Sequence, residues 1–269
     1  MPMDDYHASP ALSATRLKAA ANLTPRQYWR RHLDPTRPAF VPSDAMRQGS
    51  LVDCLLTSPG RFETTYAVMP AGLNRTTKAG KEAYAELQAS GKEIISADWL
   101  AIAQAIAGAL QADPVIGPLL KHASQSPHFW EDEQLGPCRY LPDIEAPGLL
   151  LDLKKTAAPD PRGFAVQCWN LGYDIQLAHY AAGHLDRFGG ALGQVGFIAY
   201  DWSDCPDFGL YWLPADWLLI GHQRRAEAAA RIRTYEATPT VPGTSYGSAT
   251  LELPRWATSG NRSTLNEEF

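Results

Sequence analysis

The segment 141–154 constrains the fold of this chain more than any other. It contains Leu141-Pro142-Asp143 and then Leu150-Leu151-Asp152-Leu153-Lys154. The pattern predicts a β-hairpin, with strands over 140–145 and 149–156 and a turn at Ala146-Pro147-Gly148. Because side chains alternate along a strand, Asp152 and Lys154 project from one face, which Asp143 on the neighbouring strand also reaches. The hairpin therefore brings two carboxylates and an ammonium together.

These three charges indicate a site for a cation and an anionic substrate. An Asp-x-Lys sequence inside an apolar strand is costly to bury unless the charges are paired or hold a metal. Two hard oxygen donors beside an ammonium suit Mg²⁺ or Mn²⁺. A structural salt bridge or a solvated strand edge would place the same residues together, so the hairpin leaves these alternatives open.

A helix is predicted over 161–183, where an Asp-Pro pair precedes it and a glycine ends it. Gln176 and Tyr180 lie four residues apart and share one face of this helix. Trp169 extends the same stripe and is expected in the core. A glutamine within an apolar stripe requires a hydrogen-bonding partner, and a neighbouring active site would supply one.

The remaining pattern predicts an α/β fold with a mixed central sheet flanked by helices and an N-terminal helical extension. One domain is expected over 1–236, with a helical part at 1–60, and an irregular or disordered tail over 237–269, where Pro, Gly, Ser and Thr dominate. Other predicted helices cover 9–33 (restarting at Thr24-Pro25), 44–57, 96–110 and 217–235, and predicted strands cover 193–200 and 209–213.

Asp143, Asp152-x-Lys154 and Gln176-x-x-x-Tyr180, in this order, resemble the PD-(D/E)xK nuclease superfamily. The glutamine and tyrosine are similar to the Gln-x-x-x-Tyr signature of its RecB-type branch. The chain is more similar still to RecE-like phage and prophage exonucleases (exodeoxyribonuclease VIII), and the resemblance covers about residues 6 to 215. Further matching motifs are Tyr6-His7-Ala8-Ser9-Pro10-Ala11-Leu12-Ser13, Pro25-Arg26-Gln27-Tyr28, Phe129-Trp130-Glu131-Asp132 with Gly136 and Cys138-Arg139, and Gly172-Tyr173-Asp174 before Gln176.

The resemblance implies a metal site built by four residues. Asp143 and Asp152 would hold Mg²⁺, with Mn²⁺ as a substitute, and the Leu153 carbonyl would be a further ligand. The family carries Gly-x-x-x-His on a preceding helix, with the histidine as a ligand, whereas this chain has Gly49 followed by Asp53. A carboxylate also binds hard cations, so Asp53 is an additional expected ligand.

The resemblance also implies the activity, a Mg²⁺-dependent 5′→3′ exonuclease that degrades linear double-stranded DNA in phage-type recombination by strand annealing. Lys154 would orient or help deprotonate the attacking water, and Gln176 and Tyr180 would support the metal site or the DNA backbone. Two alternatives stay open. One is an endonuclease or single-strand DNase with the same site, and the other is a catalytically degenerate DNA-binding protein, which the exchange at Asp53 motivates.

Basic residues form two clusters although the net charge is −5. Either cluster would suit DNA phosphates or a solvated helix face. The first contains Arg16, Lys18, Arg26, Arg30, Arg31 and Arg37, and the second contains Arg224, Arg225, Arg231 and Arg233.

The expected partners are double-stranded DNA ends, and the resemblance adds a single-strand annealing protein and a ring-shaped homo-oligomer. No membrane partner is expected, because no apolar run approaches the ~20 residues that span a bilayer. The first nine residues are polar and acidic, which predicts no signal peptide and a cytoplasmic location. The four cysteines lack C-x-x-C spacing, which argues against a zinc or iron–sulfur site.

Overall fold

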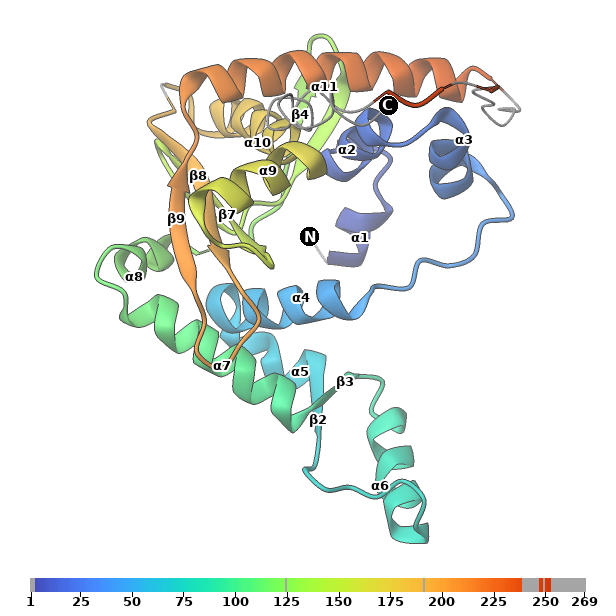
Figure 1. Ribbon diagram of the computed structural model, residues 1–269, viewed down its shortest axis with the longest axis vertical. Helices are drawn as coiled ribbons and strands as arrows, with labels where there is room; N and C mark the ends of the chain where they lie inside the picture. Colours follow the sequence, from blue (N-terminus) through green and yellow to red (C-terminus); the bar gives the residue numbers. More distant parts are fainter. Residues whose placement is uncertain (1–2, 124, 191, 239–246, 249, 253–269) are drawn as a thin grey trace, which may run out of the picture.

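A mixed four-stranded sheet is the largest sheet of the protein (Figure 1). The computed structural model describes residues 3–123, 125–190, 192–238, 247–248 and 250–252. The strand order is β6-β7-β8-β9; β7 and β8 run parallel, and the two outer pairs are antiparallel. The strands are β6 (Ile144–Ala146), β7 (Leu149–Lys155), β8 (Gln194–Tyr200) and β9 (Phe208–Trp212). The predicted α/β fold with a mixed sheet is confirmed.

Helices cover both faces of this sheet, as Figure 1 shows. Helices α4 and α7 lie on one side, and α9 and α10 lie on the other, with α2 and α11 packed against α10. The bounds are α2 (Ala14–Asn22), α4 (Asp44–Thr57), α7 (Ala97–Ala112), α9 (Pro161–Leu171), α10 (Tyr173–Phe188) and α11 (Ala215–Glu236). The predicted helix over 44–57 is confirmed, and Ser96 caps α7 by accepting a hydrogen bond from the Trp99 amide.

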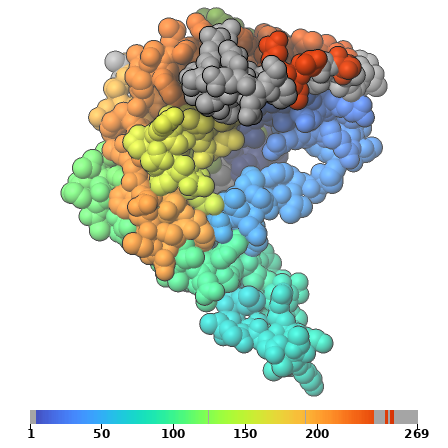
Figure 2. Space-filling model, in the orientation of Figure 1, coloured from blue at the N-terminus to red at the C-terminus, as the bar shows by residue number. Residues whose placement is uncertain are grey.

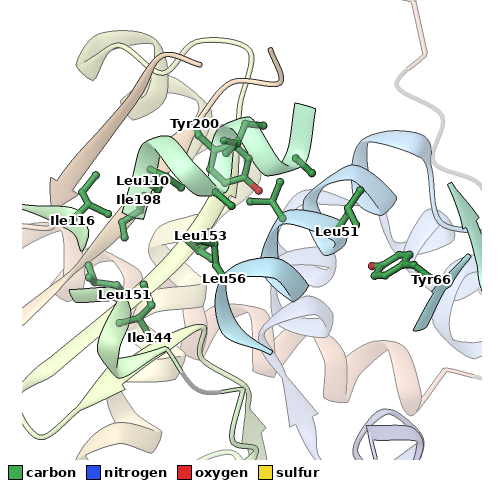
Figure 3. Close-up of a cluster of buried hydrophobic side chains, with 14 of the residues drawn as sticks. Leu51, Leu56, Tyr66, Leu110, Ile116, Ile144, Leu151, Leu153, Ile198 and Tyr200 are labelled. Carbon is green, nitrogen blue, oxygen red and sulfur yellow. The ribbon is translucent and has the colours of Figure 1, made fainter. Parts of the chain in front are cut away.

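Strand β7 is buried on both faces because both are covered. Leu151 and Leu153 belong to the cluster with α4 and α7 that Figure 3 shows. Leu150 belongs to the opposite cluster, with α9 and α10. Alternation along the strand therefore turns Asp152 and Lys154 toward α9 and α10.

The predicted hairpin is correct at its turn and wrong at its first strand. Pro147 and Gly148 form the turn between β6 and β7, and Gly148 has a positive φ of 80°. Residue 140, however, ends strand β5 (Gly136–Tyr140), which pairs with β4 (His128–Asp132) and with β1 (Leu12–Ser13) in a separate sheet. Pro142 lacks an amide hydrogen and falls in the break between β5 and β6.

The predicted single helix over 161–183 is two helices. Gly172, with φ of 69°, ends α9 in the left-handed conformation, and α10 starts at the next residue. Gly183 does not end the helix, and its contact with the ring of Tyr140 explains the glycine instead. The prediction of a buried Trp169 is also wrong, because this side chain is 49% exposed and stacks with Arg224.

The N-terminal part is helical, as predicted, with a restart at Thr24. Helix α1 (Met3–Ala8) precedes β1 and α2, and Thr24 forms a capping box with Gln27 at the start of α3 (Pro25–Tyr28). A π-helical turn, η1 (Trp29–Leu33), follows, and residues 34–43 then connect it to α4 without helix or strand.

An arm projects from the body of the molecule (Figure 1). It consists of the parallel strand pair β2 and β3 and the helix between them. Two short elements, η2 (Pro59–Arg61) and α5 (Phe62–Thr65), connect α4 to the arm. The arm itself comprises β2 (Tyr66–Met69), α6 (Lys78–Ala89) and β3 (Glu93–Ser96). After α7 come α8 (Ile116–Leu119) and η3 (Leu120–His122).

The predicted tail over 237–269 lies mostly outside the described residues. Among the described helices, none alone has the length and apolar character to cross a bilayer. The pair Ala97–Ala112 and Ile116–His122 has them only when taken together, and it is bent by 96°.

Candidate active site

The predicted Asp-x-Lys pair meets at the end of β7. The Lys154 ammonium donates a hydrogen bond to Oδ2 of Asp152, and the Asp152 side chain is almost completely buried. Burial acts to lower the pKa of Lys154, but Asp152, Tyr173 and Asp143 outweigh it and raise that pKa above its ordinary value. The lysine is therefore a charged group held beside a carboxylate, not a solvated strand edge.

Asp143 lies beside this pair, as the sequence predicts. Its Oδ2 accepts a hydrogen bond from the Leu153 amide over 2.8 Å, which ties the loop before β6 to β7. Burial, followed by the negative charge of Asp152, raises the pKa of Asp143 to about 7. The backbone of Leu153 is thus at the site, and the role of its carbonyl as a ligand stays a prediction.

Asp53 approaches the same site from α4. Its Oδ1 is buried and has no hydrogen-bond partner among the described residues. Burial, and then the charges of Asp143 and Asp152, raise the pKa of Asp53 well above its ordinary value, while Lys154 opposes them. A buried carboxylate without a partner beside two further carboxylates is electrostatically costly unless a cation joins them.

The donor chemistry of these residues fits a divalent cation. Asp53, Asp143 and Asp152 supply hard oxygens, and the unpartnered Oδ1 of Asp53 is available as a ligand. In the described part of the chain, however, no three His, Cys, Asp or Glu side chains are drawn close enough together to hold a metal. The carboxylates would therefore have to close around the ion, which their mutual repulsion opposes until the ion neutralises it.

Gln176 and Tyr180 reach the site from α10. The Gln176 Nε2 donates a hydrogen bond to Oδ1 of Asp152 over 2.8 Å, so the predicted partner of this glutamine is a site carboxylate. Tyr180 stacks with Tyr140 at 5.4 Å between ring centroids. Burial, followed by the charge of Asp152, raises the pKa of Tyr180 well above its ordinary value, which keeps the phenol neutral.

Lys18 belongs to this site, although the sequence only placed it in a basic cluster. Its Nζ donates to Oε1 of Gln176 over 2.5 Å and lies 5.2 Å from the centre of the Tyr173 ring, whose face Lys154 also approaches at 4.9 Å. Burial, and then the charge of Lys154, lower the pKa of Lys18 to about 7. No sequence signal links Lys18 to Gln176, because 158 positions separate them and only the packing of α2 on α10 joins them.

A cavity of about 730 Å³ opens beside Lys154. Its walls come from the start of α4, the end of β7, and α9. Met46, Gly49, Lys155, Gln167, Asn170 and Tyr173 are among the residues that line it. This cavity is large enough to admit a phosphodiester group to the ammonium of Lys154.

The late basic cluster has a structural role in most of its members. Arg224 pairs with Asp174 at 2.8 Å, Arg225 pairs with Asp132, and Arg231 donates to the carbonyl of Ala21. His179, to which the sequence assigns no role, is buried, and its imidazole bridges Arg225 and the carbonyl of Arg139. These contacts fix α11 and α10 relative to β4 and β5, and so stabilise the helix that carries Gln176.

Residues 13–251 match the family model described as a PDDEXK-like domain of unknown function (DUF3799). No curated protein sequence gives a significant match. A crystal structure from Eubacterium rectale, named as a putative exonuclease, has a similar fold. It shares 17% identity and a TM-score of 0.63, over 88% of this chain and 87% of that one.

The structural match at this identity supports the fold, and the family match spans most of the chain. The four-stranded sheet, with an aspartate before it and an Asp-x-Lys on its second strand, lies within the matched residues. The chain therefore belongs to the family of PDDEXK-like domains of unknown function, DUF3799.

Proposed function

We propose that this protein is a metal-dependent deoxyribonuclease that hydrolyses phosphodiester bonds. The observation that carries the proposal is the convergence of Asp143, Asp152 and Lys154, with Asp53 beside them. Lys154 also lines a cavity that is open to a substrate. Three carboxylates for a cation and one ammonium for a phosphate are the groups that metal-assisted phosphodiester hydrolysis requires. The chain's membership of the PDDEXK-like family supports the same reaction class.

Each residue of the candidate site has a defined task in this reaction. A cation held by Asp143, Asp152, the Leu153 carbonyl and Asp53 would supply a bound water of lowered pKa and neutralise charge on the phosphate. Lys154 offers its ammonium to the phosphate and orients the attacking water.

The α10 residues support this arrangement. Gln176 holds Asp152 in place through its amide. Tyr180 packs against Tyr140 at the edge of the site, and its phenol stays neutral, so it adds no negative charge beside the carboxylates.

The finer features of the proposal rest on the resemblance to RecE-like exonucleases. They are a 5′→3′ polarity on linear double-stranded DNA, Mg²⁺ as the preferred ion with Mn²⁺ as a substitute, and a role in phage-type recombination in the cytoplasm. A ring-shaped homo-oligomer and a single-strand annealing partner belong to the same proposal. The motifs before residue 30 support these features, because they match that group beyond the catalytic residues.

The test compares linear and covalently closed double-stranded DNA in the presence of Mg²⁺ or Mn²⁺. The wild type should degrade only the linear form, releasing a label from the 5′ end before one at the 3′ end. Asp152→Asn should abolish this activity, and Asp204→Asn, which removes an exposed carboxylate elsewhere, should not. Equal cutting of both DNA forms would establish an endonuclease instead.

A catalytically degenerate DNA-binding protein is the second candidate. It is favoured by Asp53 in place of the family histidine. DNA binding without cutting in either Mg²⁺ or Mn²⁺, in a wild type that binds the ion, would select this candidate.

A further inference from the structure

A groove outside the carboxylate site is lined by four arginines. It has a volume of about 860 Å³, and its walls are the end of α2, the turns α3 and η1, and the segment 37–41. Its charged residues are Arg26, Arg30, Arg31 and Arg37. No carboxylate among the described residues lines the groove.

Two of these arginines are held and two are available. Arg30 forms an ion pair with Asp34, and Arg37 donates to the backbone carbonyl of His32 over 3.1 Å. The structure gives the side chains of Arg26 and Arg31 no hydrogen bond or ion pair among the described residues, and both residues are exposed. The four arginines of the groove therefore have a single carboxylate partner between them, Asp34, although the net charge of the chain is −5.

The field in the groove is positive. His32, on the same turn, has a buried Nε2 without a partner among the described residues. Burial, and then Arg16, Arg31 and Arg37, lower the pKa of His32 to about 4. Cations concentrated without counter-ions repel one another, and an anionic ligand relieves this repulsion.

Large apolar side chains stand at the rim of the groove. Phe40 is 65% exposed and Val41 is 82% exposed, both on the segment that connects η1 to α4. An exposed aromatic ring next to guanidinium groups is a stacking surface for an unpaired base. A duplex does not offer this contact, because its bases are already stacked on each other.

The groove is continuous with elements of the carboxylate site. Helix α2 carries Lys18 and leads into one wall, while the other wall leads into α4, which carries Asp53. Figure 2 shows an opening between the connecting segment 34–43 and the body of the molecule. The groove and the site are therefore connected along the chain through α2 and through the segment that leads into α4.

We propose that this arginine groove binds the sugar-phosphate backbone of single-stranded nucleic acid. Arg26 and Arg31 contact successive phosphates, Arg30 and Arg37 form the positively charged floor, and Phe40 stacks on a base. The inference rests on the proposed nuclease function for its choice of DNA. It deepens that function by giving the unpaired strand a binding site separate from the catalytic residues.

The test measures the binding of a fluorescent 20-nucleotide oligo(dT) in EDTA, so that no cutting is required. Arg26→Gln/Arg31→Gln should weaken binding by about tenfold or more, and should reduce the slope of log affinity against log salt by about 1.4 for two lost phosphate contacts. Arg61→Gln/Lys121→Gln, which removes the same charge from two exposed positions elsewhere, should leave both quantities unchanged.

Further variants and ligands separate the contribution of base stacking from that of phosphate contacts. Phe40→Ser should weaken binding at unchanged salt slope, and Phe40→Leu should recover part of the loss. Oligo(dT) and oligo(U) compared side by side show whether the groove distinguishes DNA from RNA. The proposal is overturned if the groove double variant binds oligo(dT) like the control double variant, or if only its binding to a 20-base-pair duplex is weakened.

The binding role of the groove and the proposed nuclease function can be disproved independently of each other. Asp152→Asn should lose cleavage and retain oligonucleotide binding, because Asp152 lies outside the groove. A wild type that binds oligo(dT) through Arg26 and Arg31 but cuts no DNA would retain the groove and exclude the nuclease. A groove double variant that binds oligo(dT) as tightly as the wild type and still cuts DNA would exclude the groove and retain the nuclease.

Discussion

Gln176 joins α10 to β7 by donating a hydrogen bond from Nε2 to Oδ1 of Asp152 over 2.8 Å. A glutamine amide can present either its oxygen or its nitrogen to a neighbour. When it is protonated, Lys18 accepts no hydrogen bond, so its ammonium selects the oxygen and leaves the nitrogen for the acceptor-only carboxylate of Asp152. Lys18 thereby orients a residue that in turn orients a carboxylate of the candidate site.

Replacement of Lys18 by methionine should lower kcat by about 10- to 100-fold with little change in KM, because the amide of Gln176 loses its fixed orientation. Lys18→Arg should restore part of the rate, since a guanidinium also donates to the Gln176 oxygen. The measurement is steady-state cleavage of a labelled duplex, with the exposed Lys121→Met as the control. An unchanged kcat in Lys18→Met would remove this lysine from the positioning role.

Asp53→Ala should weaken Mn²⁺ binding by about 10- to 100-fold, because one of three converging carboxylates is removed. Asp53→His should retain binding, since imidazole is also a ligand for this ion. Titration calorimetry with Mn²⁺ measures both effects without any reference to cleavage, and Asp204→Ala is the control. Wild-type affinity in Asp53→Ala would show that α4 contributes no ligand.

His179 should make folding stability depend on pH. Burial, and then the charge of Arg225, lower its pKa to about 3 in the folded protein, against about 6.5 in the unfolded chain. Below pH 6.5, His179 is protonated in the unfolded chain but stays neutral in the folded protein. The free energy of unfolding therefore falls as the pH falls from 6.5 toward 3.

The comparison for this prediction is His179→Gln, whose amide can replace both hydrogen bonds of the imidazole without a charge change. Relative to this variant, the wild type should lose about 2 kcal/mol of stability between pH 7.5 and pH 5. Urea unfolding at the two pH values measures the difference. His122→Gln, at an exposed position, should show no such trend, and a parallel response of all three proteins would disprove the prediction.

Two helical glycines should respond to alanine with opposite signs. In Gly183→Ala the new Cβ would lie 2.5 Å from ring carbons of the buried Tyr140, so stability should fall by about 1–3 kcal/mol. Gly108, within α7, has no atom within 4 Å of the corresponding position, so Gly108→Ala should gain roughly 0.5–1 kcal/mol. Thermal or urea unfolding measures both, and a stabilised Gly183→Ala would show that Tyr140 moves aside freely.

The local sequence by itself determined the polar pair on β7, the turn before this strand and the span of α4. Alternation placed Asp152 and Lys154 on one face, Pro147 and Gly148 formed the turn, and the helix predicted over 44–57 has these bounds in the structure. These features depend on dihedral preferences and on hydrophobic periodicity within a few residues. Both can be recognised without knowing which other segments of the chain pack against them.

Tertiary structure alone decided the break at Gly172, the exposure of Trp169, and the membership of Lys18 in the site. A glycine within an apolar period continues a helix or ends it according to what packs against its two sides, which the local sequence does not contain. Lys18, likewise, read as one more cation of a basic cluster. It meets Gln176 only because α2 packs on α10, and this contact between distant segments turns a surface-like pattern into part of a buried hydrogen-bond network.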